Sequence, residues 1–322
     1  MRTVATADHI KSLIKAHLDR DDEKFKTVVL QVAAYEAKQN HAAFARELKS
    51  LLDKSNHAKS RIVQINNQNQ MLTMSSPDIR LTDLIVSDEI SSRIHRILNE
   101  YTNRSKLKKH GLSNRRKILL EGAPGTGKTM TASVIAAQLH LPLFVVQMDK
   151  IVTKFMGETS VKLRQIFDSI ENFSGVYLFD EFDAIGSDRS FDNEVGEMRR
   201  VLNSFLQFIE QDSSDSIIIA ATNNHKMLDQ ALFRRFDDVL HYSLPTKNEI
   251  SRLLKHKLEG FSVKLTYTEE LIESALKLSQ AEIAKVCDDA IKLSILNDKQ
   301  LSQNDLIALI NERLSAYSSQ EA

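Results

Sequence analysis

Residues 117–129 read KILLEGAPGTGKT, and this stretch decides which fold the chain can adopt. Between Gly122 and Thr129 it matches the pattern G-x-x-x-x-G-K-[ST], preceded by strand-forming residues and followed by a helical pattern. Glycines at these places let backbone N–H groups turn toward phosphate oxygens, and a helix N-terminus adds the positive end of its dipole. A chance glycine-rich turn is the alternative, and the flanking strand and helix make it negligible. The predicted phosphate loop consists of Gly122, Ala123, Pro124, Gly125, Thr126, Gly127, Lys128 and Thr129.

The last two residues of this loop predict the ligand. Lys128 is expected to reach the β and γ oxygens of a nucleoside triphosphate. Thr129 is expected to offer its hydroxyl to Mg²⁺. ATP and Mg²⁺ are therefore the predicted cofactors.

A buried strand over 176–179 is followed by two carboxylates, Asp180 and Glu181. Because ligands collect at the carboxyl ends of parallel strands, we expect Asp180 to hold Mg²⁺ and Glu181 to polarise the attacking water as general base. For the string alone a solvated acidic turn is an equal alternative, but the upstream phosphate loop reduces it to a small minority. Asn223 follows another predicted strand, where its amide could orient the lytic water, and a simple turn residue explains it equally well.

Apolar strand-like runs alternate with helical stretches from about residue 80, which predicts an α/β fold with a parallel sheet sandwiched by helices. After Pro245 only helical periodicity continues, so the sequence predicts an all-helical C-terminal lid. The predicted strands are 117–121, 143–147, 176–179, 217–221 and 239–243, and the predicted lid helices are roughly 247–259, 268–278, 280–297 and 302–316. The predicted domains are a small helical N-terminal domain (1–54), a linker (55–79), the α/β core (80–244) and the lid (245–322).

Composition excludes several classes of protein. Lys plus Arg and Asp plus Glu number 43 each, so no net field attracts nucleic acid or an acidic membrane surface. The single cysteine, Cys287, cannot form an internal disulfide. No apolar run approaches the ~20 residues of a membrane span, so no membrane association is expected and the cytoplasm is the predicted compartment.

Several motifs in a fixed order resemble the AAA family of hexameric ATPases, in the branch of protein-remodelling enzymes that includes katanin and spastin. The resemblance covers about residues 80–316. It rests on His110-Gly111-Leu112, the phosphate loop, Phe179-Asp180-Glu181-Phe182-Asp183, Ala221-Thr222-Asn223, and Leu228-Asp229 through Arg234-Arg235-Phe236-Asp237.

The resemblance implies a homo-oligomer, a hexameric ring, in which Asn223 takes the sensor-1 position. Arg234 and Arg235 take the positions of the arginine fingers that reach the ATP of the neighbouring subunit. The family usually spaces these arginines by a few residues including Gly, and here they are adjacent, which leaves open which one is the finger. Without the family, a solvated basic helix end is the better explanation. Residues 279–282 resemble the family's S-G-A-[DE] and lack the sensor-2 arginine of clamp loaders and helicase loaders.

Phe155 and Met156 resemble the central pore loop with which the family grips a threaded polypeptide, so the resemblance implies a protein substrate. The alternative for Phe155 is a core residue at a loop-to-helix junction. Residues 1–54 resemble the N-terminal segment of bacterial single-module AAA proteins, some of which sit beside subtilisin-like proteases. A protease partner and a helical hairpin that merely packs on the ring explain this segment equally well.

The sequence therefore predicts an ATPase that couples hydrolysis of Mg-ATP to the remodelling or threading of a protein substrate. One alternative is a nucleotide-gated scaffold or switch with slow turnover. Another is a nucleic-acid-handling AAA protein, whose best candidate surface is the basic stretch 104–117. This stretch lacks interleaved aromatic residues, so nucleic acid is the less favoured partner.

Overall fold

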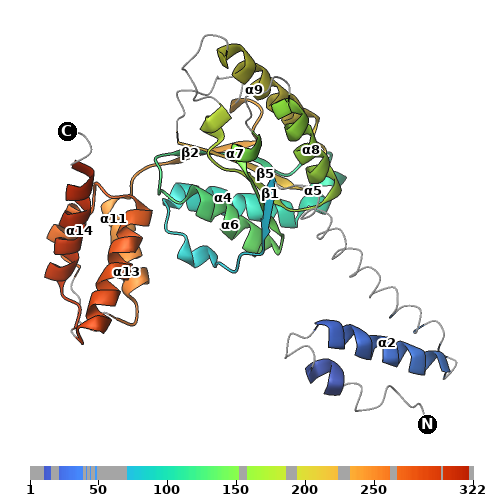
Figure 1. The fold of residues 1–322 in the computed structure, drawn as a ribbon, viewed down its shortest axis with the longest axis horizontal. Helices are drawn as coiled ribbons and strands as arrows, with labels where there is room; N and C mark the ends of the chain where they lie inside the picture. The colour runs from blue at the N-terminus through green and yellow to red at the C-terminus, as the bar shows by residue number, and fades with distance from the viewer. Residues whose placement is uncertain are drawn as a thin grey trace. The chain divides into compact units, whose positions relative to one another are not determined.

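The computed structural model confirms an α/β protein that carries additional helices. It describes residues 11–15, 22–38, 41, 44, 48, 71–151, 158–185, 194–223, 233–261, 267–298 and 300–318. The chain divides into two compact units, Met1–Asn69 and Gln70–Ala322 (Figure 1).

The first unit is helical in its described part. Helix α2, Asp22–Lys38, buries Val28 and Val32, one turn apart, as the helical periodicity predicts. Near its end Glu36 is 4% exposed, and its Oε2 lies 2.6 Å from Nδ1 of His41. A carboxylate this deeply buried needs such a partner, so the pair fixes the end of the helix.

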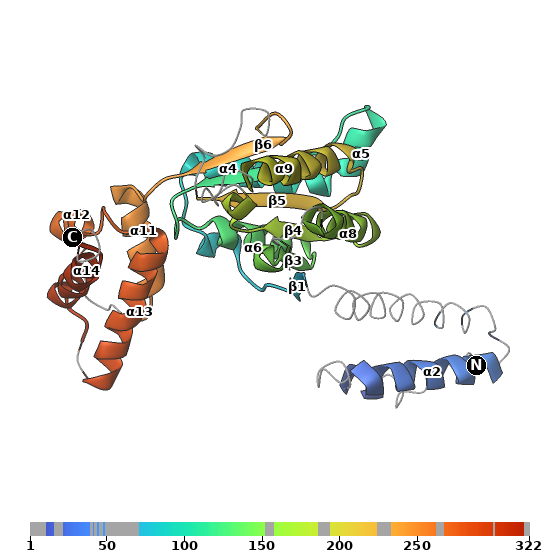
Figure 2. The same cartoon turned by 45° about the horizontal axis from the view of Figure 1, so that its top comes forward.

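The second unit is built on a six-stranded sheet in the order β1-β3-β4-β5-β2-β6 (Figures 1 and 2). All neighbouring pairs from β3 to β6 are parallel, so their carboxyl ends lie at one edge of the sheet. This confirms the predicted parallel sheet, with β2 between β5 and β6. The strands are β1 Leu72–Ser75, β2 Lys117–Gly122, β3 Leu143–Val146, β4 Val176–Phe179, β5 Ile217–Thr222 and β6 Asp238–Tyr242.

Strand β1 corrects part of the predicted linker. The sequence assigns 55–79 to a linker, whereas 72–75 pair antiparallel with β3, with Leu72 opposite Val146. Four residues are too few to show a reliable alternation of apolar and polar side chains. The strand forms because the edge of β3 offers it unpaired backbone groups, which is a tertiary effect.

Helices cover both faces of the sheet (Figure 1). On one face α4 and α6 bury Ile94 and Ile135 in the same cluster as Leu120 of β2. On the other face aromatic rings pack together, with the ring centroids of Phe179 and Phe205 5.0 Å apart. The helical elements are η1 Leu81–Asp83, α4 Asp88–Thr102, α5 Arg104–Lys109, α6 Lys128–Leu139, α7 Met148–Ile151, α8 Glu158–Asn172, η2 Phe182–Ile185 and α9 Glu194–Gln211.

The predicted all-helical C-terminal part is confirmed and has a core of its own. Two of its helices begin with capping boxes, in which Thr246 pairs with Glu249 and Ser279 with Glu282. Buried leucine, isoleucine and valine side chains from all four helices form one cluster. The helices are α11 Lys247–Leu258, α12 Glu269–Ser274, α13 Gln280–Leu296 and α14 Gln303–Ser318.

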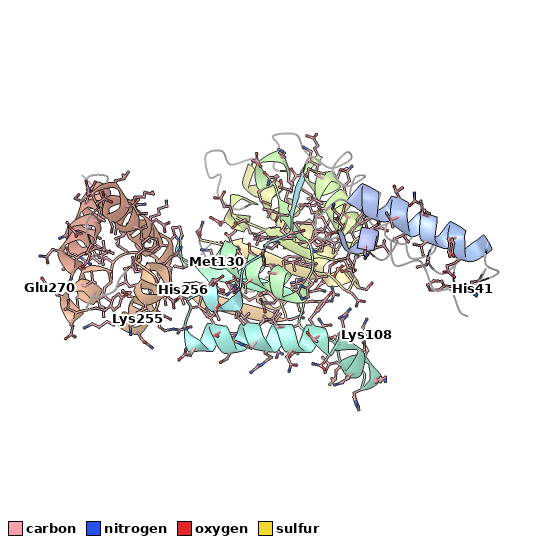
Figure 3. All side chains as sticks on the ribbon, turned by 90° about the horizontal axis from the view of Figure 1, so that it is seen from below. His41, Lys108, Met130, Lys255, His256 and Glu270 are labelled. Atoms are coloured by element: carbon pink, nitrogen blue, oxygen red, sulfur yellow. The ribbon has the colours of Figure 1, made fainter. Side chains whose placement is uncertain are left out.

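One apolar contact and two polar side-chain pairs are among the contacts that join the lid to the α/β core. Ile85, in the segment between η1 and α4, is buried in the lid cluster. His256, on the side of the lid that faces the core (Figure 3), lies 3.4 Å from Asp83, and Arg252 lies 3.5 Å from Asp88. Because exposed ion pairs contribute little, burial of Ile85 contributes more to the attachment than these two side-chain pairs do.

Gly122 is the point where β2 leaves the sheet, and it generates a prediction. A Cβ atom there would lie 2.1 Å from the carbonyl oxygen of Tyr242, and its φ is +147°. We expect Gly122→Ala to lower the free energy of unfolding by about 1 to 3 kcal/mol more than Gly111→Ala does. Gly111, with φ +72° and no atom within 4 Å of an added Cβ, reports the backbone strain alone. Equal denaturant midpoints for the two variants would contradict the close approach.

Candidate functional site

The predicted phosphate loop lies between β2 and the first turn of α6. Its backbone takes left-handed conformations at Gly125 and Gly127, with φ of +76° and +101°. Thr126 is fully buried and donates a 2.7 Å hydrogen bond to the carbonyl oxygen of Ala123. The loop is therefore a tight turn held by its own side chains, with the N-terminus of α6 at its end.

Lys128 is a buried cation at the start of α6, only 6% exposed. Its Nζ donates to the carbonyl oxygens of Gly122 and Ala123 at 2.7 and 2.8 Å. Burial lowers the pKa of Lys128, and the nearby carboxylates of Asp180 and Asp183 act in the opposite direction. An anionic ligand would relieve the cost of this desolvated charge.

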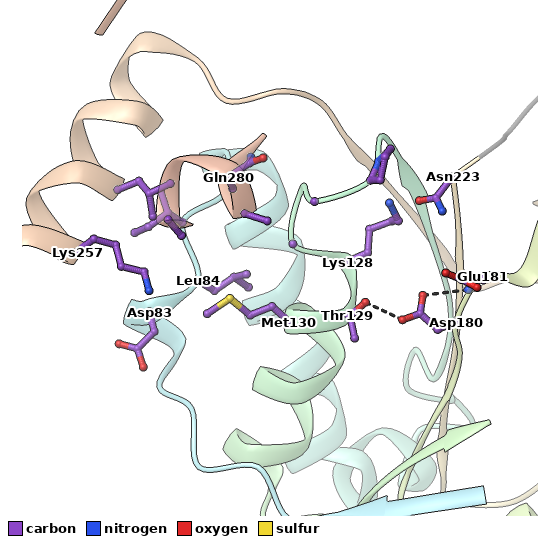
Figure 4. Close-up of a pocket in the computed structure, with 17 residues that line it drawn as sticks. Asp83, Leu84, Lys128, Thr129, Met130, Asp180, Glu181, Asn223, Lys257 and Gln280 are labelled. Carbon is purple, nitrogen blue, oxygen red and sulfur yellow. Dashed lines mark hydrogen bonds between the residues drawn. The ribbon is translucent and has the colours of Figure 1, made fainter. Parts of the chain in front are cut away.

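The structure brings the two predicted Mg²⁺ residues together. Thr129 Oγ1 donates a 2.7 Å hydrogen bond to Oδ2 of Asp180, which joins α6 to the carboxyl end of β4 (Figure 4). A hydroxyl beside a carboxylate is an all-oxygen donor set, the kind that Mg²⁺ prefers, so these two residues fit the ion.

Glu181 and Asn223 also line the same cavity. Glu181 has φ +51°, a conformation uncommon for a residue with a side chain, and its backbone N–H donates to Oδ1 of Asp180 at 3.0 Å. The backbone N–H of Asn223 donates to Oδ1 of Asp183 at 3.1 Å, which fixes the end of β5 beside the end of β4. Asp183 thus has a positioning role that the sequence pattern did not indicate.

The cavity has a volume of about 430 Å³ and is walled by the core on one side and the lid on the other (Figure 4). This volume is within the usual range for small-molecule sites. The backbone N–H of Ala281, in the first turn of α13, donates a 2.9 Å hydrogen bond to the carbonyl oxygen of Gly125. The lid therefore touches the phosphate loop directly.

Sequence motifs did not indicate part of the cavity wall, and most of this part is apolar. The only local signal was the apolar run from Leu84 to Val86, directly before the N-cap Ser87 of α4. The lid residues that face this run could not be predicted, because they depend on how the lid packs against the core. The wall residues missed by the motifs are Asp83, Leu84, Ile85, Met130, Leu253, Lys257 and Ala284.

The predicted arginines lie apart from the cavity of their own chain, because neither is among the described residues that line it. Arg235 Nε lies 2.9 Å from Oε1 of Glu210 on α9, and the Arg235 side chain is 30% exposed. Arg234 is exposed. Phe155 and Met156 lie outside the described residues.

A glycine-rich loop between a strand and a helix, a buried lysine and a threonine–aspartate pair at the carboxyl ends of parallel strands define a P-loop ATPase. The family model described as "ATPase family associated with various cellular activities (AAA)" matches residues 118–244. An uncharacterized AAA family ATPase of Sinorhizobium fredii, y4kL, is 33% identical over 294 residues, 88% of each chain. The chain belongs to the AAA family of ATPases, and ATP hydrolysis is its activity.

Other relatives are longer than this chain. The ATP-dependent zinc metalloprotease FtsH 2 of Thermoanaerobacter is 31% identical over 69% of this chain and 44% of its own. A putative 26S proteasome regulatory subunit homolog of Methanothermobacter thermautotrophicus is 28% identical over 58% of this chain and 51% of its own. The match thus covers about half of each of these two relatives. In the described part of the chain no helix is long and apolar enough to cross a membrane.

The geometry around Lys128 predicts the outcome of removing its charge. We expect Lys128→Met to weaken ATP binding at least roughly 100-fold, because each charge-assisted hydrogen bond contributes about 1.5 to 3 kcal/mol. Lys117→Met is the matched control. Lys117 is half-buried, its pKa is also lowered by burial, and its Nζ contacts the carbonyl oxygen of Ile209, away from the cavity. Calorimetric titration with ATP distinguishes the two, and equal losses would contradict a specific role for Lys128.

Proposed function

We propose that this AAA ATPase is a motor that converts ATP hydrolysis into remodelling or threading of a protein substrate. The observation that carries the proposal is the position of the cavity between the core and the lid, with Ala281 hydrogen-bonded to Gly125. A ligand that contacts both parts favours the lid position in which both sets of contacts form. Binding and release of nucleotide would then move the lid. The names of the FtsH metalloprotease and proteasome-subunit relatives point to protein substrates and support this proposal.

The polar residues of the phosphate loop and of the strand ends have proposed roles. Lys128 binds the β and γ phosphates, while Thr129 and Asp180 hold Mg²⁺, which would neutralise phosphate charge when bound. Asp180 already accepts hydrogen bonds on both carboxylate oxygens, one from Thr129 and one from the N–H of Glu181. The Glu181 side chain is exposed to the cavity, which supports Glu181 as the general base for the attacking water. Asn223 orients that water.

Arg234 is the better candidate for the finger that acts on a neighbouring subunit's ATP in a homo-oligomeric ring. Arg235 is held by Glu210 of its own chain, whereas Arg234 is exposed at the same turn. A guanidinium that must reach another subunit has to be free to leave its own surface. This supports Arg234 as the trans residue and a positioning role for Arg235.

We expect Arg234→Ala to slow ATP hydrolysis roughly 10³-fold or more, the usual effect of an arginine finger. Arg235→Ala should slow it far less, because it removes one partly exposed ion pair. Turnover at saturating ATP measures both variants. Mixing Arg234→Ala subunits with Lys128→Met subunits should restore part of the activity, because an interface in which the Arg234→Ala subunit supplies the site and the Lys128→Met subunit supplies the finger is intact.

The control mixes Arg234→Ala subunits with subunits that carry both Arg234→Ala and Lys128→Met, and these should stay inactive. Mixed assemblies are verified by native mass spectrometry. Inactivity of the first mixture despite verified mixing would refute the trans role. Recovery that depends on Arg235 instead would reverse the assignment.

The structure weakens the nucleic-acid alternative. In the basic stretch 104–117, Arg115 contacts Glu100, Arg116 contacts Asp212 and Lys117 contacts a backbone carbonyl, so these charges are engaged inside the chain. Lys108 on α5 (Figure 3) pairs with Asp215 at 2.8 Å. These contacts reduce the charge left for phosphates to the residues around α5, where Lys106 and Lys109 are exposed.

The motor and the scaffold alternatives differ in what Phe155 does. If Phe155 grips a threaded chain, Phe155→Ala should keep the melting temperature and basal ATP hydrolysis, and should lose unfolding of a tagged model protein. A core Phe would instead cost ~3 to 5 kcal/mol of stability on truncation. Phe205→Ala measures the loss of stability expected for a core phenylalanine, because Phe205 is fully buried against the rings of Phe179 and Phe182. A melting drop like that of Phe205→Ala would favour the scaffold.

A further inference from the structure

The side chain of Tyr242, at the end of β6, reaches the phosphate loop through one intermediate residue. Its hydroxyl lies 2.6 Å from Oγ1 of Thr131, and Thr131 is fully buried on α6. Oγ1 of Thr131 in turn donates a 3.0 Å hydrogen bond to the carbonyl oxygen of Gly127, the last glycine of the loop. A continuous chain of hydrogen bonds therefore connects β6 to the loop.

The direction of this chain follows from hydrogen counting. A threonine hydroxyl carries one hydrogen, and here that hydrogen points to the Gly127 carbonyl. The hydrogen between Tyr242 and Thr131 must then come from the phenol. Burial raises the pKa of Tyr242, so the phenol stays protonated and can donate throughout the physiological range.

Tyr242 also meets the first glycine of the loop through its backbone. In the register of β2 and β6, Gly122 lies opposite Tyr242, close enough that an added Cβ would collide with its carbonyl oxygen. One residue therefore contacts Gly122 directly and Gly127 through Thr131. The same strand leads into the lid, because α11 begins at Lys247, five residues after Tyr242.

We propose that Tyr242 is a positioning residue that holds the phosphate loop, through Thr131, in the shape that binds the phosphates of ATP. The proposal rests on the proposed role of the loop in binding ATP. Phosphate binding requires several backbone N–H groups to face one point, and a loop anchored at both ends holds that shape for a larger fraction of time. Apparent affinity falls in proportion to the fraction of molecules in the competent shape.

A merely structural role would require only the volume of the ring, which phenylalanine supplies. Tyr242→Phe removes the donor and keeps the ring, while Thr131→Val removes the intermediate hydroxyl. Each should raise the dissociation constant of a non-hydrolysable ATP analogue roughly three- to tenfold, the equivalent of one buried hydrogen bond. The loss should appear in KM more than in kcat, since bound phosphates themselves hold the loop.

Three further variants make the test specific. Tyr177→Phe is the matched control, because Tyr177 is a fully buried tyrosine on β4 whose single hydroxyl hydrogen is shared between the carbonyl oxygens of Ser169 and Phe173, at 3.1 and 2.9 Å. It should leave nucleotide affinity unchanged. Thr131→Ser keeps the hydroxyl and should bind like the original chain. The double variant Tyr242→Phe, Thr131→Val should bind no more weakly than the weaker single variant, because both changes break one chain.

Calorimetry and thermal melts of these full-length variants decide the matter. Tyr242→Phe with an affinity equal to that of Tyr177→Phe would overturn the proposal, and so would additive losses in the double variant. Lys128→Met distinguishes failure of the ATP-binding role of the loop from failure of the positioning role of Tyr242. If it retains ATP affinity, the loop is not the phosphate site and the proposed function fails first; if it loses affinity while Tyr242→Phe does not, only the positioning role fails.

Discussion

The close approach of Gly122 to the main chain of Tyr242 is the constraint on which the site depends. Because no side chain separates β2 from the end of β6, the backbone can leave the sheet there and turn into the phosphate loop. The turn ends at the N-terminus of α6, where Lys128 is buried and Thr129 faces Asp180. The parallel order of β4, β5 and β2 then brings Glu181 and Asn223 to the same edge of the sheet. Polar groups that follow three strands line one cavity because these strands are parallel neighbours.

The charges of the molecule fall into two groups with different physical roles. Arg115 and Arg116 form ion pairs with carboxylates of the same chain, so they stabilise the core and are not available to bind an anionic partner. Lys128 is instead held by two neutral carbonyl groups in a cavity, where burial lowers its pKa. A desolvated cation without a direct ion pair in its described surroundings gains most from an incoming polyanion. Lys117 is also partly buried against a neutral carbonyl group, so what sets Lys128 apart is that its side chain lines the cavity.

The lid forms the second wall of the cavity in the AAA core. It is attached to the core by contacts of different kinds, one apolar and one polar. Apolar packing at Ile85 holds it to the core, while the polar contact of Ala281 with Gly125 lies at the phosphate loop itself. Ile85 and Ala281 both line the cavity, so a ligand bound there would meet the apolar and the polar contact of the lid. The proposed nucleotide-driven movement of the lid requires a ligand that contacts the two parts differently in its two positions.

The sequence by itself determined the fold class, the strands and lid helices to within a few residues, and the residues of the phosphate loop and the acidic pair. These features are local, since strands, helices and glycine turns are set by side chains adjacent in the chain. The tertiary structure alone decided strand β1, the apolar wall of the cavity, the pairing of Arg235 with Glu210 and the contact of Tyr242 with Thr131. Each of these joins residues far apart in sequence, and their meeting depends on strand order and on the fold of the lid, which no local pattern records.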